Sequence, residues 1–241
     1  MENTLKKEFI DYYKNRNDKN NLFLVGQLEY DTKYCPSDER KNGIRVYKNV
    51  LGLTRFSGVV DHIPVKLPIY EDVDLNELTE GTLISIEGNL CAISRKVLDE
   101  NDNLKNKMEI FALTKRLYVN ENMSYELFGD HVDNKVIVEG DICSDVVKRK
   151  TPSGIFLADY QFRNVSKNAN GILFRNYIPC ISWGKEAWAL PTERHSFGTI
   201  EGRIQSRDYI NSKGEQHTTL ELSASHFKSA PNPYTLSLKR K

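Results

Sequence analysis

The chain has 241 residues, of which 39% are hydrophobic and 28% charged, and its formal net charge is +1. This length suits one large domain or two small ones, and the composition is typical of a folded protein. No run of about 18 apolar residues occurs, which argues against a membrane-spanning helix, and the charged N-terminus argues against a signal peptide. We therefore expect a cytoplasmic protein with no membrane partner.

The N-terminal segment NTLKKEFIDYYKNR predicts a short amphipathic helix within residues 1–20. Leu5, Phe9, Tyr12 and Tyr13 recur there at helical spacing, which gives the helix one apolar face. That face is expected to cover either the next domain or a partner chain.

Three short motifs of the first half recur in the second half, in the same order. FLVGQL resembles VIVEGDI, HIPV resembles YIPC, and SIEGNL resembles TIEGRI. Gly26 matches Gly140 at an offset of 114 residues, and His62 matches Tyr177 at an offset of 115. Motifs repeated at one offset predict two copies of one domain. The predicted boundaries are 21–120 for the first copy, 121–134 for a linker, 135–228 for the second copy and 229–241 for a basic tail.

The second copy predicts five strands and a helical segment. The strand sequences are KVIVEGDI, IFLADYQFRNV, YIPCISW, GTIEGRIQSRDYI and QHTTLELSAS, separated by turns such as TPSG and NSKG. A short helix over GKEAWAL, interrupted by Pro191, falls between the third and fourth strands. This order fits a small Greek-key barrel of the OB type. The predicted fold class is all-β, with two tandem five-stranded OB-fold barrels and a short N-terminal helix.

The third predicted strand of the second copy carries two aromatic residues on one face. Side chains alternate along a strand, so Tyr177, Pro179, Ile181 and Trp183 share a face. The aromatic pair forms either an edge of the core or a platform on which flat ligands stack. Trp188, in the helical segment, is assigned to packing.

These motifs carry a family resemblance. TPSGIFLADYQF, YIPCISWGKEA and GTIEGRIQSRDYINSKGEQHTTLELSA resemble the bacterial single-stranded DNA-binding protein family, in the right order over residues 135–227. The first copy shares the resemblance only through the repeat. In that family, aromatic residues just before the Gly-Lys pair and in the fourth strand stack on DNA bases. The resemblance implies this role for Tyr177, Trp183 and Tyr209.

Stacked bases need cations nearby, because each nucleotide carries a phosphate. Lys185 follows the aromatic strand, Arg203 and Arg207 lie on the next strand, and Lys148, Arg149 and Lys150 lie on the predicted loop between the first two strands. The predicted DNA-binding residues are Tyr177, Trp183, Lys185, Tyr209, Arg203, Arg207, Lys148, Arg149, Lys150 and Arg163.

The sequence departs from the family in two places besides the extra N-terminal segment. The first copy has His62, Pro68 and Arg95 where the second has its three aromatic residues. It is therefore expected to bind DNA weakly, to bind through charge, or to serve as an assembly surface. The chain also ends in NPYTLSLKRK, where the family usually has an acidic tail that recruits other enzymes. No acidic recruiting tail is expected.

No enzymatic site is expected. The five histidines lack metal-ligand spacing, the four cysteines form no C-x-x-C pair, and no phosphate-binding glycine loop occurs. We therefore expect neither a metal nor another cofactor.

Two classes of function remain open. The first is a sequence-tolerant single-stranded DNA-binding protein of replication, recombination or DNA transfer, encoded by a phage or other mobile element. The alternative is an accessory module of a primosome or recombination complex, with nucleic-acid binding secondary. RNA is a further candidate ligand. Because the family commonly presents four OB domains per functional unit, a chain with two is expected to form a homodimer.

Overall fold

The computed structural model describes residues 16–34, 45–69, 74–98, 104–119, 134–167, 173–210, 214 and 216–232. Within these ranges the fold is all-β, with one short 3-10 helix and one short α-helix. Residues 1–15 of the segment predicted as an N-terminal helix lie outside the described residues; residues 16–19 are not helical, and a strand begins at Asn20. No helix in the described ranges is long and apolar enough to cross a membrane.

The chain divides into two compact units. The first comprises Met1–Asn20, Ile137–Gly202 and Ala224–Lys241, and the second comprises Asn21–Val136 and Arg203–Ser223. The strands β11 (Phe197–Ile210) and β12 (Gln216–Ser229) run through both units. The tandem domains 21–120 and 135–228 stay a prediction, because the units follow spatial contacts rather than the limits of the sequence repeat.

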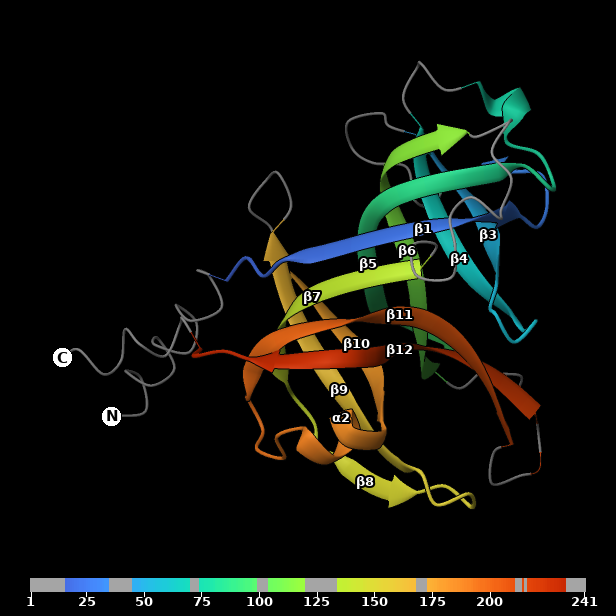
Figure 1. The fold of residues 1–241 in the computed structure, drawn as a ribbon. Coiled ribbons are helices and arrows are strands. Elements are labelled where there is room, and N and C mark those ends of the chain that lie inside the picture. The colour runs from blue at the N-terminus through green and yellow to red at the C-terminus, as the bar shows by residue number, and fades with distance from the viewer. Residues whose placement is uncertain are drawn as a thin grey trace. The chain divides into compact units, whose positions relative to one another are not determined.

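The second unit contains the strands of the first half of the chain (Figure 1). They are β1 (Asn20–Leu28), β2 (Lys33–Tyr34), β3 (Arg45–Thr54), β4 (Val60–Ile69), β5 (Leu83–Leu98) and β6 (Leu104–Val119), with the 3-10 helix η2 at Leu75–Glu77. They are hydrogen-bonded in the order β2-β3-β4-β6-β5-β1, and an additional β1–β3 pairing closes the order into a barrel. Leu24, Leu51, Ile63 and Ile86 are fully buried in its core.

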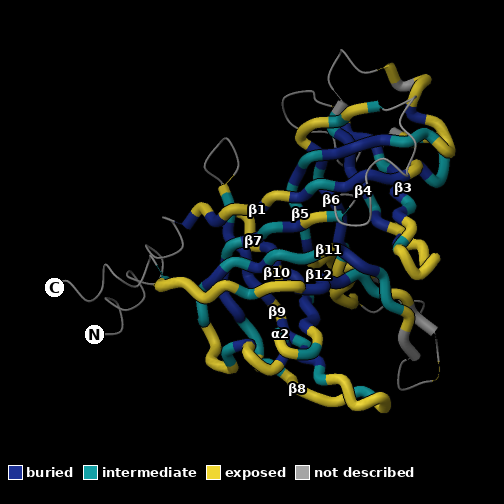
Figure 2. Tube along the Cα trace, in the orientation of Figure 1, coloured by how far each residue is buried: buried dark blue, intermediate teal, exposed yellow. Residues whose placement is uncertain are grey.

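The strands of the second half follow the same plan. They are β7 (Asn134–Ile142), β8 (Val147–Lys150), β9 (Phe156–Lys167), β10 (Leu173–Trp183), β11 and β12, with helix α2 (Gly184–Ala189) after β10. Their order is β8-β9-β10-β12-β11-β7, and β7 also pairs with β9. Val138, Phe162, Ile178 and Ile200 are fully buried, whereas all of β8 is exposed (Figure 2).

Matching glycines explain one of the repeated motifs in physical terms. A Cβ atom at Gly26 would lie 2.7 Å from the carbonyl oxygen of Gly52, and one at Gly140 would lie 2.2 Å from that of Arg163. Gly26 precedes Gln27, which pairs with Gly52 of β3, and Gly140 precedes Asp141, which pairs with Arg163 of β9. Only glycine permits so close a backbone approach, so barrel closure requires this residue type at both positions.

Residues 16–19 pack in the first unit against β7 and β9. The backbone N–H of Asp18 donates to the carbonyl of Val165 (2.8 Å), and the N–H of Val165 donates to the Asp18 carboxylate (2.8 Å). The N–H of Glu139 donates to the carbonyl of Lys19 (2.9 Å). This short segment therefore supplies backbone partners to both strands.

The same segment completes a buried network of charges. Arg16 is fully buried and binds the carboxylates of Asp18 and Asp141, and Asp141 also accepts a hydrogen bond from Arg163 Nε (3.2 Å). Burial favours the neutral form of Asp141, but hydrogen bonds from Arg163 and Arg16 outweigh it and lower the pKa of this carboxyl. At Asp18 burial outweighs the bond to Arg16 and raises the pKa. The network thus holds two arginines next to one strongly ionised carboxylate.

Candidate nucleic-acid interface

The aromatic face of β10 is formed as its alternating pattern predicts. Trp183 and Tyr177 keep 38% and 39% of their surface exposed, whereas Ile181 between them is buried. The other face, with Ile178 and Ser182, is buried in the core. Both aromatic rings therefore lie at the surface of the first unit, not inside its core.

Strand register shows which residues share this face. Trp183 is paired with Leu157 of β9, and Leu157 is paired with Arg149 of β8. Directly paired residues lie on the same face of a sheet, so Arg149 belongs to the row of Trp183. Lys148 and Lys150 project from the opposite face. The sequence predicted one loop with three cations, but these residues form strand β8, which divides them between two faces.

The three cations consequently have different surroundings. Arg149 is exposed and bonds Asp159 at 2.8 Å, on the aromatic face. Lys148 donates from Nζ to the carbonyls of Trp188 (2.8 Å) and Leu190 (3.0 Å), at the end of α2. Lys150 lies over the ring of Phe156, with Nζ 4.6 Å from its centroid. Arg149 is the member of this run that lies in the row of Trp183, with Leu157 between them, while Lys148 bonds the end of the helix.

Gly184 accounts for the end of the aromatic strand. Trp183 is still extended and precedes the first helical residue, Gly184, which has a φ of +58°. This left-handed conformation favours glycine, and it lets the chain turn directly into α2. Lys185 therefore follows the aromatic face at once, with an exposed side chain.

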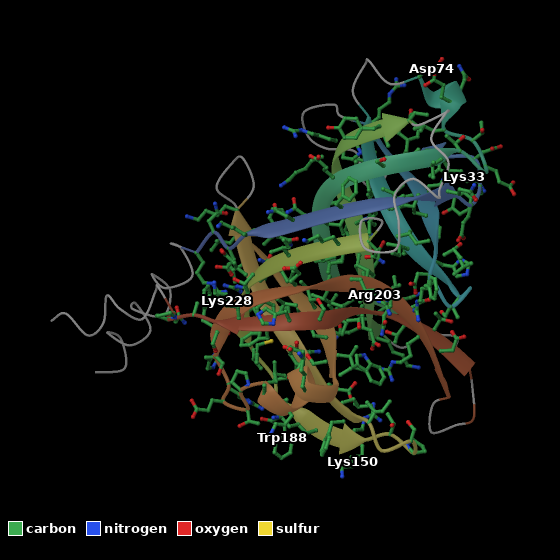
Figure 3. The ribbon with its side chains drawn as sticks, in the orientation of Figure 1. Lys33, Asp74, Lys150, Trp188, Arg203 and Lys228 are labelled. Carbon is green, nitrogen blue, oxygen red and sulfur yellow. The ribbon has the colours of Figure 1, made fainter. Side chains whose placement is uncertain are left out.

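Trp188 differs from the packing role predicted for it. Its surface is 68% exposed, and its ring meets Phe156 edge to face at a centroid distance of 5.3 Å. Helix α2 has only six residues and contacts β9 and β10. Its indole covers one ring and otherwise faces solvent, at the end of the unit where Lys150 also lies (Figure 3).

Two predicted phosphate ligands are engaged in ion pairs. Arg163 is only 8% exposed and bonds Asp141, as described above. Arg207 bonds Glu221 at 3.0 Å, and Gln205 donates to the same buried carboxylate (3.0 Å). Both arginines are paired with a buried carboxylate, which would lose its partner if the guanidinium turned to a phosphate, whereas Asp159, the partner of Arg149, is 31% exposed. We therefore leave Arg163 and Arg207 out of the interface.

The remaining predicted residues lie on β11. Arg203 is exposed (Figure 3). Tyr209 belongs to the strand, but its side chain lies outside the described part of the structure. In the first unit Tyr177, Trp183 and Arg149 lie on one face of the sheet, and Lys185 follows two residues after Trp183. We call these four residues the platform.

The corresponding face of the first-half strands has a different chemistry. His62 bonds Glu29, and Arg95 bonds Glu109 at 3.0 Å. Lys66 is buried, with Nζ 4.1 Å from the centroid of Phe111. His62, Lys66 and Arg95 are thus each engaged with a carboxylate of the protein. The positions that match the platform aromatics hold a paired imidazole and a half-buried proline, Pro68.

Metal binding is not indicated in the part of the chain that the structure describes. No group of three or more His, Cys, Asp or Glu residues there is arranged to hold an ion.

Comparison with known proteins identifies the family of the second half. The model of the Single-strand binding protein family matches residues 133–230. Single-stranded DNA-binding protein 4 of Streptococcus agalactiae serotype V is 35% identical over 100 residues, which cover 39% of this chain and 72% of that protein. The chain belongs to the single-strand binding protein family. Single-stranded DNA-binding protein A of Bacillus subtilis, another similar protein, is 26% identical over 95 residues, or 38% of this chain and 55% of that protein.

Solved structures extend the likeness to nearly the whole chain. The wild-type single-stranded DNA binding protein from Thermus aquaticus aligns with a TM-score of 0.64 and 18% identity, over 90% of this chain and 95% of that one. A deletion mutant of the same protein gives a TM-score of 0.62. At this identity the likeness concerns the fold, and it includes strands that the single-strand binding protein family model does not match.

Proposed function

We propose that this protein binds single-stranded DNA with little sequence preference, and that the platform makes the principal contacts. One observation carries the proposal. This member of the single-strand binding protein family exposes Tyr177 and Trp183 on one face of β10, and Arg149 lies on the same face, in the row of Trp183. Every base has a flat face, so stacking on these rings does not depend on sequence.

The platform separates two kinds of contact. Tyr177 and Trp183 stack on bases, and each stacked base contributes about 1–3 kcal/mol. Lys185 and Arg149 lie where phosphates pass and supply the salt-dependent part of the affinity. Arg149 exchanges its bond to Asp159 for a phosphate. Arg203 and Tyr209 on β11 are proposed as additional contacts from the second unit.

The two halves are proposed to be tandem OB domains with different roles. At the positions that match Tyr177, Trp183 and Tyr209 the first-half domain has His62, Pro68 and Arg95, so no aromatic ring stands at those positions. That domain is proposed to contribute little to stacking. Two domains per chain also support a homodimer, which brings together four OB domains.

The wider setting follows from this ligand. Replication, recombination or transfer of DNA is the proposed process, and the protein acts by binding rather than by catalysis. The proposed location is the cytoplasm.

The test is a fluorescence titration with oligo-dT at low salt. The chain has two tryptophans, and stacking of a thymine on the exposed indole of Trp183 should quench its emission strongly. A parallel titration with oligo-U measures the preference for DNA over RNA. If neither oligonucleotide changes the emission or binds in an anisotropy assay, the role of an assembly module is favoured instead.

A further inference from the structure

The hairpin between β3 and β4 makes a contact that the platform does not explain. Its residues Arg55 and Asp61 lie in the second unit, together with Arg203–Ser223 of β11 and β12. We call the parts Arg203–Ile210 and Gln216–Ser223, which are neighbouring strands, the arm. The arm carries two proposed DNA contacts, Arg203 and Tyr209.

Asp61 accepts a hydrogen bond from the backbone N–H of Ser206, and Arg55 donates one to its carbonyl. The backbone N–H and the Oγ of Ser206 donate to Asp61 Oδ1, at 2.6 and 2.9 Å. Arg55 donates from Nη2 to the carbonyl of Ser206 (2.7 Å) and from Nε to Asp61 Oδ2 (2.7 Å). Asp61 is 1% exposed, so these charge-assisted bonds are shielded from water and correspondingly strong.

The contact continues into the arm. The hydrogen bond with Asp61 and the negative charge of Glu221 keep the pKa of Arg55 above its ordinary value, although burial opposes this. Glu221 in turn binds Gln205 and Arg207 on the facing strand. One connected set of charges therefore joins the β3–β4 hairpin to both strands of the arm.

The sequence repeat provides no equivalent contact from the second half of the chain to the first. At the offset of 115 that matches His62 with Tyr177, Asp61 corresponds to Asn176, which has no carboxylate. At the offset of 114 that matches Gly88 with Gly202, Ser206 corresponds to Ala92, which has no hydroxyl. A reciprocal contact, from the second half to the first, would therefore lack both the carboxylate and the hydroxyl, so the contact is not a feature shared by the two copies.

We propose that Asp61 and Arg55 are positioning residues that fix β11 at Ser206, so that the arm presents Arg203 and Tyr209 to single-stranded DNA in a prearranged position. Each of those residues lies three positions from Ser206. An arm fixed before binding avoids the entropy that a loose one loses on binding, and so binds more tightly. The inference rests on the proposed function. It gives the first half a role in binding without requiring it to touch DNA.

The test compares Asp61→Ala and Arg55→Ala with a matched control. Arg116→Ala also removes one cation of the first half, from an exposed ion pair with Glu87 (3.2 Å). Amide hydrogen exchange at Ser206 reports on the contact itself, and anisotropy with a labelled oligo-dT reports on affinity. The full chain is used throughout. Asp61→Asn, which keeps one acceptor oxygen, replaces Asp61→Ala if the latter does not fold.

Both variants should speed exchange at Ser206 at least about tenfold and weaken binding about three- to tenfold. Their salt dependence should match the parent, because neither side chain contacts a phosphate. Arg116→Ala should change neither quantity. In a background that already carries Arg203→Ala and Tyr209→Ala, Asp61→Ala should cause no further loss of affinity, because there is no contact left to position.

Three results would overturn the positioning role: unchanged exchange at Ser206, faster exchange with parental affinity, or an equal loss of affinity in the background without Arg203 and Tyr209. The last would mean that Asp61 acts through general stability. A parent that does not bind single-stranded DNA refutes the proposed function itself, whereas a binding parent with unaffected variants refutes the positioning role alone.

Discussion

Replacing Trp183 by alanine tests stacking apart from folding, because the variant should lose affinity while it stays folded. Removing a fully buried tryptophan costs about 3–5 kcal/mol of stability. Trp183 is 38% exposed, so the cost here scales down to about 2–3 kcal/mol, within the usual total stability of a folded domain. The variant should fold. Its affinity for oligo-dT should fall by about 1–3 kcal/mol, or roughly 5- to 140-fold.

Trp188→Ala is the matched control for this experiment. The chain has two tryptophans, so each variant leaves one indole as the fluorescent reporter. With Trp183 as the remaining indole, oligo-dT should still quench the emission and bind with nearly parental affinity. With Trp188 as the remaining indole, quenching should be weak. Anisotropy of a labelled oligonucleotide measures both affinities independently of the reporter.

Several outcomes would contradict this reasoning. Equal losses of affinity in the two variants would place the DNA near Trp188 as well as on the platform. A folded Trp183→Ala protein with parental affinity would mean that bases stack elsewhere. A change in the slope of log affinity against log salt would show that the substitution also disturbs phosphate contacts.

Three further predictions concern charge and assembly. Lys185→Ala should lower the salt slope by about 0.7, whereas Arg207→Ala should leave it unchanged because Glu221 already pairs with this arginine; salt titrations of both variants decide this. Asp141→Asn should lower the free energy of unfolding, measured in denaturant, by about 3–5 kcal/mol, because two buried arginines lose their carboxylate. The folded-state pKa of Asp141 is lowered, so its ion pairs stabilise the parent above the ordinary carboxyl pKa of 3.8 and are lost as the pH falls below it; acid unfolding curves should therefore be flatter for the variant. Sedimentation at micromolar concentration should show a homodimer, and a stable monomer would refute it.

The features that could be predicted from the sequence are those set by local pattern. The alternation in YIPCISW predicts that Tyr177 and Trp183 share a face, and the structure places that pair at the surface. Gly184 indicates the end of that strand, because its positive φ favours glycine. The order of the strands follows in the same way, from β-branched runs separated by turn residues.

The features that could not be predicted depend on contacts between distant residues. In the sequence, Arg163 cannot be told from an exposed strand arginine. Its partner Asp141 lies 22 residues earlier in the chain, and only the fold brings the two together. The contact of Asp61 with Ser206 spans 145 residues and leaves no motif. Alternation along Val147–Lys150, if this segment is taken as a strand, separates Arg149 from Lys148 and Lys150, but only the pairing with β9 and β10 shows that Arg149 is on the aromatic face.

The position of residues 16–19 has a consequence for how the protein is made. Arg16 and Asp18 pack with β7 and β9, in a unit that also needs the strand segment after Ala224. A ribosome adds about 5–20 residues per second, so some 200 residues must be synthesised, over roughly 10–40 s, before all parts of this unit exist. For the first 125 of these residues, or about 6–25 s, Arg16 is without Asp141. The first unit therefore cannot finish folding until most of the chain has been synthesised.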